Sequence, residues 1–170
     1  MDHHVIGYYT AWGTDHKGYT PACIPAGKLT HINYAFATIC PESFRCILGN
    51  PEADTQRVFT AKESVDGIGD YPDKQANGMH GNFNQLRKLK AKHPHLKVLI
   101  SIGGWTGSDE FTDMALTKDS RREFVDSCIQ VFFRNYPGLF DGVDIDWEFP
   151  VYGGLREGRG IPGLDQPDGV

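Results

Sequence analysis

The chain has 170 residues, of which 39% are hydrophobic and 23% are charged, so it can bury one core and is neither a disordered nor a fibrous chain. A formal net charge of −5 at pH 7 excludes a strongly basic surface, and we therefore expect no nucleic-acid partner. We expect no membrane span either, because no apolar run approaches the roughly 20 residues that a span requires.

Strand-like and helix-like segments alternate along the chain, which predicts an α/β fold with a parallel sheet. Four runs have the composition of strands, namely residues 5–9, 30–37, 96–101 and 142–148. A helix is expected over residues 82–92 with Asn82 as its N-cap. A second helix is expected over residues 120–136, with a capping box formed by Ser120 and Glu123.

The stretch of residues 40–81 is polar, rich in Asn, Asp, Gly and Pro, and shows no periodic pattern. We expect a long insertion there, because loops of this length without secondary structure usually form part of a binding rim or are partly mobile. Residues 153–170 show no periodic pattern either.

Four cysteines allow three pairings if all are bridged, and the sequence does not choose among them. Cys40 and Cys46 flank a short polar stretch and are candidates for a disulfide that closes a loop, as in many secreted proteins. Cys128 falls among the apolar positions of the second helix and is expected to be a buried thiol. The cysteines do not have the spacing of a zinc site, so we expect no metal.

Three carboxylates, Asp144, Asp146 and Glu148, alternate with apolar residues in the last predicted strand. Alternate side chains of a strand share a face, so the three carboxylates should lie together, with neighbours roughly 6.5 to 7 Å apart along the backbone. Mutual repulsion and burial should raise the pKa of at least one of them, which suits a general acid. A solvated acidic edge is less favoured because of the bulky apolar partners. A magnesium site is less favoured because no phosphate-binding glycine loop lies beside it.

Residues 101–105 (Ser-Ile-Gly-Gly-Trp) form a second cluster at the end of the third strand. Two glycines there permit close approach of a ligand or of another backbone, and the tryptophan offers a flat face for a sugar ring. A glycine pair alone is also typical of a tight βα turn. Further aromatic residues lie at or near the ends of the first two strands, and with the acidic face they favour a carbohydrate cleft: Tyr8, Tyr9, Trp12, Tyr34 and Phe36.

Residues 141–148 (DGVDIDWE) match the DxxDxDxE signature of the family 18 glycoside hydrolases, the chitinases and their relatives, and residues 101–104 match the SxGG element of that family. Residues 7–9 and 33–37 resemble its first two barrel strands. The resemblance implies a TIM (β/α)8 barrel, which typically needs eight strands and about 250 residues. Residues 1–170 would then form the N-terminal half of the catalytic barrel, with about the first four β/α units and the insertion at residues 40–81.

For function, the resemblance implies hydrolysis of β-1,4-linked N-acetylglucosamine polymers (chitin) by a retaining, substrate-assisted mechanism without a cofactor. Glu148 would be the acid/base that protonates the glycosidic oxygen. Asp146 would hold the N-acetyl group of the substrate, and Asp144 would share a proton or charge with Asp146. Asp141 and Ser101 would be structural. The residues that would line the sugar subsites are Tyr8, Phe36, Gly103, Gly104, Trp105 and Phe149.

Two alternatives remain beside a chitinase. An endo-β-N-acetylglucosaminidase acting on glycoprotein glycans uses the same acidic signature. The second alternative is a non-catalytic chitin-binding lectin or an inactive fragment, although the presence of the acid Glu148 argues against a lectin. The expected partners are chitin or N-acetylchitooligosaccharides, together with the missing C-terminal half-barrel or a second copy of the chain, because four strands alone would leave two open edges. We expect an extracellular location, with a signal peptide that is removed from a longer precursor.

Overall fold

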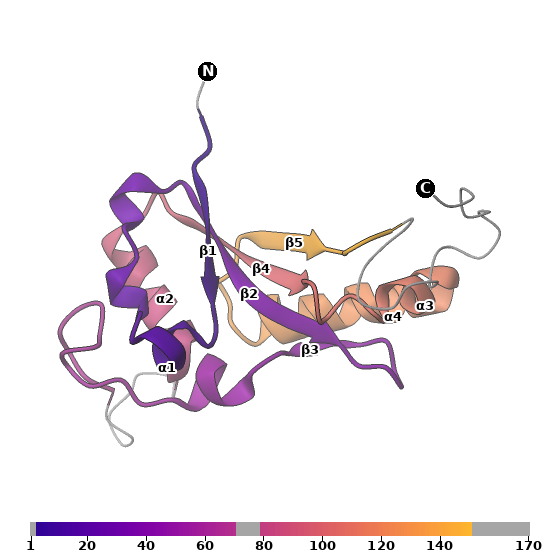
Figure 1. The fold of residues 1–170 in the computed structure, drawn as a ribbon, viewed down its shortest axis with the longest axis horizontal. Coiled ribbons are helices and arrows are strands. Elements are labelled where there is room, and N and C mark those ends of the chain that lie inside the picture. Colours follow the sequence, from indigo (N-terminus) through magenta and orange to yellow (C-terminus); the bar gives the residue numbers. More distant parts are fainter. Residues whose placement is uncertain (1–2, 71–78, 151–170) are drawn as a thin grey trace, which may run out of the picture.

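The computed structural model describes residues 3–70 and 79–150. Four strands, β1 (Ile6–Thr10), β2 (His31–Ile39), β4 (Lys97–Gly103) and β5 (Gly142–Asp146), pair in parallel in the order β1-β2-β4-β5 (Figure 1). All four predicted strands are confirmed, with their ends shifted by one or two residues. A short strand that the sequence does not predict, β3 (Cys46–Leu48), pairs antiparallel with the end of β2.

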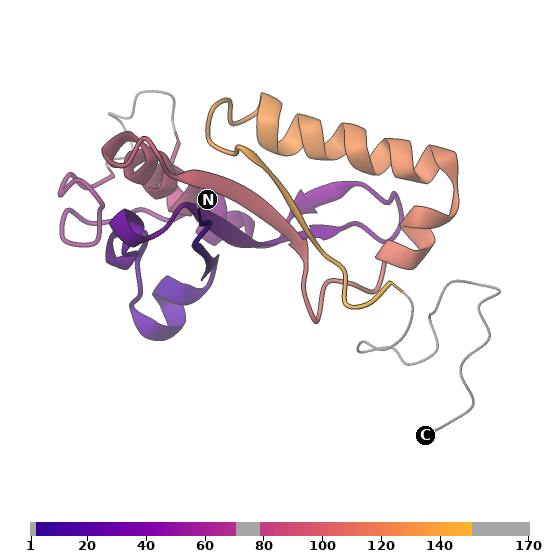
Figure 2. The same cartoon turned by 90° about the horizontal axis from the view of Figure 1, so that it is seen from above.

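Helices connect the parallel strands. α2 (Gly81–Lys92) lies between β2 and β4, whereas α3 (Phe111–Leu116), α4 (Lys118–Cys128) and the π-helical turn η5 (Ile129–Arg134) lie between β4 and β5. Figure 2 shows the long helical stretch of α4 and η5 along one side of the sheet; at its end the chain turns back and enters β5. Short turns follow β1, namely α1 (Gly13–Lys17), η1 (Pro21–Cys23) and η2 (Ala26–Lys28).

Both predicted helix starts are wrong in detail. The N-cap of α4 is Thr117, which forms a capping box with Ser120, because the Thr117 hydroxyl accepts the Ser120 N–H at 3.0 Å. Glu123 forms an ion pair with Arg45 instead of capping the helix. The N-cap of α2 is His80, and Asn82 lies inside the helix, fully buried.

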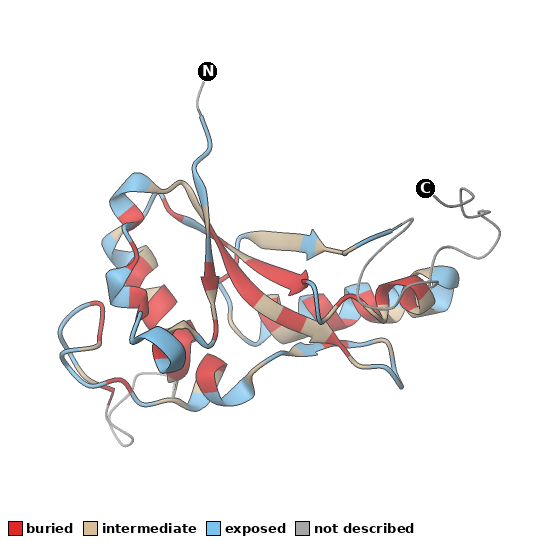
Figure 3. Ribbon diagram, in the orientation of Figure 1, coloured by how far each residue is buried: buried red, intermediate tan, exposed pale blue. Residues whose placement is uncertain are grey.

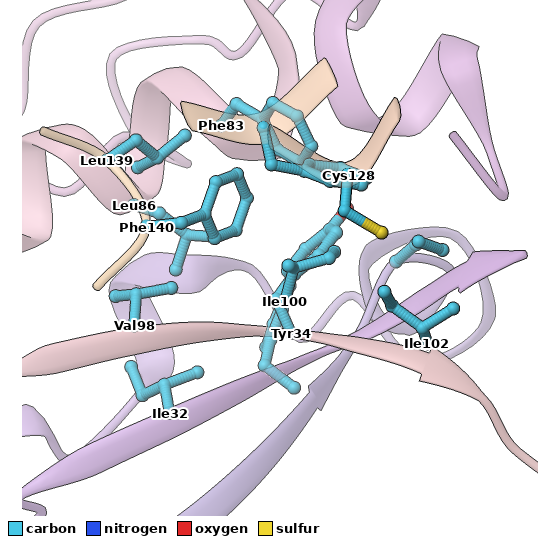
Figure 4. Packing of buried hydrophobic residues seen from close by; sticks show 14 of the residues in the cluster. Ile32, Tyr34, Phe83, Leu86, Val98, Ile100, Ile102, Cys128, Leu139 and Phe140 are labelled. Atoms are coloured by element: carbon cyan, nitrogen blue, oxygen red, sulfur yellow. The ribbon is translucent and has the colours of Figure 1, made fainter. Parts of the chain in front are cut away.

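The core lies between one face of the sheet and the helices. Alternate side chains of β2 and β4 point into it and pack against aromatic and aliphatic residues of α2, α4, η5 and the segment before β5 (Figure 4). The fully buried members include Ile32, Tyr34, Val98, Ile100, Ile102, Phe83, Leu86, Phe132 and Leu139. Figure 3 shows that β2 and β4 are mostly buried and that β5 is mostly of intermediate exposure. The opposite face of the sheet is therefore free to carry polar groups.

The described part of the insertion at residues 40–81 is structured, contrary to the expectation of a loop without secondary structure. It contains β3 and the π-helical turn η3 (Glu52–Gln56). Buried carboxylates hold it to the core: Asp54 accepts a hydrogen bond from the Tyr34 hydroxyl at 2.5 Å, and Asp70 accepts one from the Asn84 amide at 2.9 Å. The polar residues of this insertion therefore take part in buried hydrogen bonds and do not indicate a lack of structure.

All four cysteines are free thiols, so the Cys40–Cys46 disulfide is not formed. Ile39 and Cys46 are partners in the antiparallel pair β2–β3 and are both buried, so they share one face of the ribbon. Cys40, the next residue after Ile39, therefore lies on the other face. Cys128 is buried, as predicted.

Within the described residues, the structure contains no helix that is both long enough and apolar enough to span a membrane.

Candidate active site

Asp144, in the outer strand β5, lies on the sheet face opposite the core. Its Oδ2 atom accepts three hydrogen bonds, from the Tyr8 hydroxyl at 2.9 Å, the Asn33 amide at 2.9 Å and the Ser101 hydroxyl at 2.8 Å. Each donor belongs to a different strand, so this one oxygen joins β1, β2 and β4 to β5. The Asn33 contact is not among the predicted site residues, although an asparagine within an otherwise apolar strand is a signal that identifies it.

Asp146 lies at the carboxyl end of β5, beside Gly103 in the sheet register and on the same face as Asp144. Burial raises the pKa of Asp146, and the negative charge of Asp144 raises it further. The rise in pKa that the sequence predicts within the acidic triad thus falls on Asp146. A carboxyl group that retains its proton more readily can donate as well as accept hydrogen bonds.

Glu148 lies two residues beyond the end of β5, so the alternation of strand side chains applies to Asp144 and Asp146 but not to Glu148. Its backbone is held by Ser108: the Glu148 N–H donates to Ser108 Oγ at 2.9 Å. The same hydroxyl lies 2.8 Å from the Gly104 carbonyl oxygen and 3.0 Å from the Asp146 carbonyl oxygen. Ser108 is a positioning residue that the sequence does not reveal, because it stands in an ordinary polar loop.

The glycines after β4 are required by close packing. Gly103 and Gly104 have φ angles of 109° and 76°, and the Gly104 N–H donates to the Asp146 carbonyl oxygen at 2.8 Å. A Cβ atom at Gly103 would lie 2.4 Å from that carbonyl oxygen, and one at Gly104 would lie 2.6 Å from the Phe36 ring. The structure therefore shows the close approach of a backbone and an aromatic ring, and it also shows the tight turn, because the Gly107 N–H donates to the Gly104 carbonyl oxygen at 3.1 Å.

A cleft of about 300 Å³ opens at the carboxyl ends of β1, β2 and β4. The Trp12 and Phe36 rings lie on its wall, with centroids 6.2 Å apart. Of the residues predicted to contact sugar, Phe36 and Gly103 line this cleft. Tyr8, Trp105 and Phe149 are not among its lining residues, and their side chains are about half exposed. The complete lining is Ala11, Trp12, Phe36, Ala37, Thr38, Gly49, Asn50, Gly103, Thr106 and Gly107.

Asp141 lies apart from this face, at the start of β5. It accepts hydrogen bonds from the Val98 N–H at 2.9 Å, from Lys90 Nζ at 2.6 Å and from Lys97 Nζ at 3.3 Å. Partial burial acts to raise its pKa, but the hydrogen bonds and the lysine charges together hold the pKa below its ordinary value. Asp141 thus joins α2 and β4 to β5.

Across residues 3–70 and 79–150, the structure brings together no group of three or more His, Cys, Asp or Glu side chains suited to a metal ion.

Comparison with known proteins identifies the family to which this chain belongs. The model of the Glycosyl hydrolases family 18 matches residues 4–160, which is most of the chain. This chain belongs to that family. Its four parallel strands and their helices are accordingly part of a TIM barrel. Asp146 lies at the carboxyl end of β5, and TIM barrels carry their active sites at the carboxyl ends of their strands.

Chitinases are among the most similar relatives. Chitinase A1 of Niallia circulans is 39% identical over 180 residues, in a match that covers 89% of this chain and 24% of the relative. Chitinase C of Streptomyces lividans is 41% identical over 155 residues, covering 88% of this chain and 24% of the relative. The chain thus spans about a quarter of the length of these curated relatives.

Solved structures agree with this assignment. The catalytic domain of psychrophilic chitinase B from Arthrobacter TAD20 superimposes with a TM-score of 0.80 at 36% identity, covering 88% of this chain and 41% of that one. Chitinase ChiA74 from Bacillus thuringiensis gives a TM-score of 0.74 at 34% identity, and the match covers 96% of this chain and 29% of that chain. The chain therefore corresponds to part of these larger chitinase chains.

Proposed function

We propose that residues 1–170 are the N-terminal half of a family 18 catalytic barrel that hydrolyses chitin and N-acetylchitooligosaccharides. The observation that carries the proposal is the acidic array on the open face of the sheet: Asp144 and Asp146 lie side by side, Asp146 has a raised pKa, and Glu148 follows two residues later. The chitinases among the relatives support the choice of substrate.

In the proposed reaction, the Glu148 carboxylic acid donates its proton to the glycosidic oxygen as the bond to the anomeric carbon breaks. The carbonyl oxygen of the substrate's own N-acetyl group attacks that carbon and forms an oxazolinium ion. Asp146 holds and orients the N-acetyl group, and Asp144 shares a proton or charge with Asp146. The Glu148 carboxylate then takes a proton from the water that opens the oxazolinium ion, so the anomeric configuration is retained.

The surrounding residues have supporting roles in this proposal. Ser101 and Tyr8 hold Asp144 by hydrogen bonds, and Ser108 holds the backbone of Glu148. The sugar units of the substrate would contact Phe36 and Gly103 in the cleft and the neighbouring Gly104. They would also contact three exposed aromatic residues: Tyr8, Trp105 and Phe149. We propose an extracellular location, because chitin is a polymer outside the cell that must be degraded there.

The test is hydrolysis of a fluorogenic N-acetylchitooligosaccharide by the chain, alone and joined to the second half of the Arthrobacter TAD20 barrel, which supplies the remaining strands. We expect Glu148→Gln to lower the hydrolysis rate of the active form by at least about 100-fold, since general acid catalysis contributes that much. Binding of the oligosaccharide should change little. Glu123→Gln is the matched control, because Glu123 lies on α4 and pairs with Arg45 outside the site.

Hydrolysis at an undiminished rate in Glu148→Gln would contradict the proposal. Release of glycans from a glycoprotein, without cleavage of the chitooligosaccharide, would favour an endo-β-N-acetylglucosaminidase. Binding without hydrolysis in the joined barrel would favour a lectin.

A further inference from the structure

Two of the four cysteines face each other in the core. Cys46, in β3, and Cys128, at the end of α4, are only 1% and 5% exposed, and their side chains lie close enough for Cys128 to shift the pKa of Cys46. Figure 4 shows the Cys128 sulfur within the layer of packed side chains. The other two thiols have different neighbours, because Cys40 contacts Glu42 and Cys23 lies beside Thr20. The fold thus brings together two cysteines that are far apart in the sequence.

The backbones that carry this pair are held by contacts that do not involve sulfur. The Cys46 N–H donates to Ser127 Oγ at 2.8 Å, which joins β3 directly to the last turn of α4. Arg45 forms an ion pair with Glu123 one turn earlier on the same helix. Cys46 is also fixed in register opposite Ile39 of β2. The juxtaposition of the two thiols therefore follows from the packing of β3 on α4.

We propose that Cys46 and Cys128 are the site of a disulfide that forms when the chain folds in an oxidising medium. A disulfide needs its two sulfur atoms about 2.05 Å apart, and two thiols that already lie close to each other are the pair nearest to that arrangement. This proposal is independent of the catalytic proposal, because neither cysteine lies on the face that carries Asp144 and Asp146.

The oxidant would be a small disulfide such as oxidised glutathione. The thiolate of one cysteine attacks a glutathione sulfur, forms a mixed disulfide and releases one glutathione thiolate. The thiolate of the second cysteine then attacks the protein sulfur of the mixed disulfide and releases the second glutathione. The two protein thiols are oxidised, one glutathione disulfide is reduced to two thiols, and the two protons of the cysteines pass to the released glutathiones.

The order of events follows from the surroundings of the thiols. The interaction of the protonated Cys46 thiol, as donor, with Cys128, followed by burial, raises the pKa of Cys46, so little thiolate exists in the folded chain. Closed packing also keeps an oxidant away from both sulfurs. The bond should therefore form during folding, before the core closes, and the reduced folded protein should react slowly.

The disulfide would stabilise one wall of the proposed substrate cleft. It would close a loop of about 80 residues and fix β3 to α4, and long loops give the larger stabilisation. Gly49 and Asn50, which follow β3 directly, line the cleft. The disulfide would thus anchor one wall of the cleft to the helical layer.

The experiment is refolding of the full 170-residue chain in a buffer of reduced and oxidised glutathione, followed by alkylation and non-reducing peptide mapping by mass spectrometry. We expect one linked pair of peptides, which contain Cys46 and Cys128, with Cys23 and Cys40 alkylated. Addition of oxidised glutathione to the reduced folded chain should form the bond at least roughly tenfold more slowly than refolding does, because each unit by which the pKa is raised lowers the thiolate fraction tenfold.

The thermal unfolding midpoint supplies a second readout. Reductant should lower the midpoint of the oxidised chain by about 5 °C or more. It should do the same in Cys40→Ser, the matched control, and have no effect in Cys128→Ser. Free thiols at Cys46 and Cys128 after oxidative refolding, or a link between Cys40 and Cys46, would overturn the proposal.

Discussion

Asp144 and Asp146 differ in environment although they are chemically the same and only two residues apart. Asp144 accepts three hydrogen bonds from neighbouring strands, whereas the Asp146 carboxyl is influenced by burial and by the charge of Asp144. The strand alternation predicts that they share a face, but the difference between them depends on Tyr8, Asn33 and Ser101. Those donors belong to strands that are distant in the sequence, so their convergence cannot be predicted locally.

Removal of the Asp144 charge should lower the pKa of Asp146. In Asp144→Asn we expect that pKa to move toward its ordinary value without reaching it, because burial is the larger cause of the rise and remains in the variant. Carbon-13 NMR titration of the carboxyl groups measures this directly. Asp126→Asn, an exposed position on α4, is the control and should leave the pKa of Asp146 unchanged. A pKa of Asp146 that rises or stays constant in Asp144→Asn would refute the coupling.

The elements of the insertion show where sequence patterns stop being informative. Hydrophobic runs predict the four parallel strands, because apolar residues recur in each of them, and in β2 and β4 most of these residues are buried in the core. The sequence does not predict β3, which has three residues, nor η3, whose contact with the core is polar. In η3, Asp54 hydrogen-bonds to Tyr34 of β2, and the Asn82 amide donates to the same hydroxyl at 3.0 Å. A buried polar network of this kind has no periodicity, and its residues are typical of exposed loops.

Asp54 should make the stability of this insertion depend on pH. Burial raises its pKa from 3.8 to about 6, despite the hydrogen bond from Tyr34 that opposes the rise. The folded chain therefore binds the Asp54 proton more tightly than the unfolded chain. This contribution to stability is complete below pH 3.8 and is lost as the pH rises through about 6, and it amounts to about 3 kcal/mol.

The free energy of unfolding, measured with urea at pH 4 and pH 7, tests this dependence. Relative to the wild type, Asp54→Asn should gain up to about 3 kcal/mol of stability between the two pH values, since its side chain does not ionise. Asp66→Asn is the control. Burial opposes ionisation of Asp66, but hydrogen bonds led by that from Lys88 lower its pKa overall from 3.8, so the contribution of Asp66 is lost only at a pH below that range. This variant should therefore show nearly the same change in stability between pH 4 and pH 7 as the wild type. The same pH dependence in the wild type and in Asp54→Asn would show that Asp54 does not carry the effect.

At the scale of the whole molecule, the sheet has two open edges. β1 and β5 are the outer strands of the parallel order, and each has a neighbour on one side only. Apolar side chains remain exposed on both, with Ile6 on β1 at 56% and Ile145 on β5 at 51%. The alternation of β5 assigns Ile145 to the apolar face with Val143, yet its side chain is half exposed, because burial depends on neighbouring strands as well as on alternation.

Open edge strands with exposed apolar residues favour association, because unpaired backbone groups of one sheet can pair with those of another. We expect the isolated chain to form dimers or larger species in solution, and Ile145→Lys to shift it toward the 18.9 kDa monomer by placing a charge on the β5 edge. Light scattering coupled to size-exclusion chromatography measures the mass. Leu116→Lys is the matched control, since Leu116 is similarly exposed at 54% but lies on the helix α3 and not on an edge strand. A monomeric wild type at all concentrations would show that the edges do not drive association, whereas an equal response of both variants would assign it to general hydrophobicity.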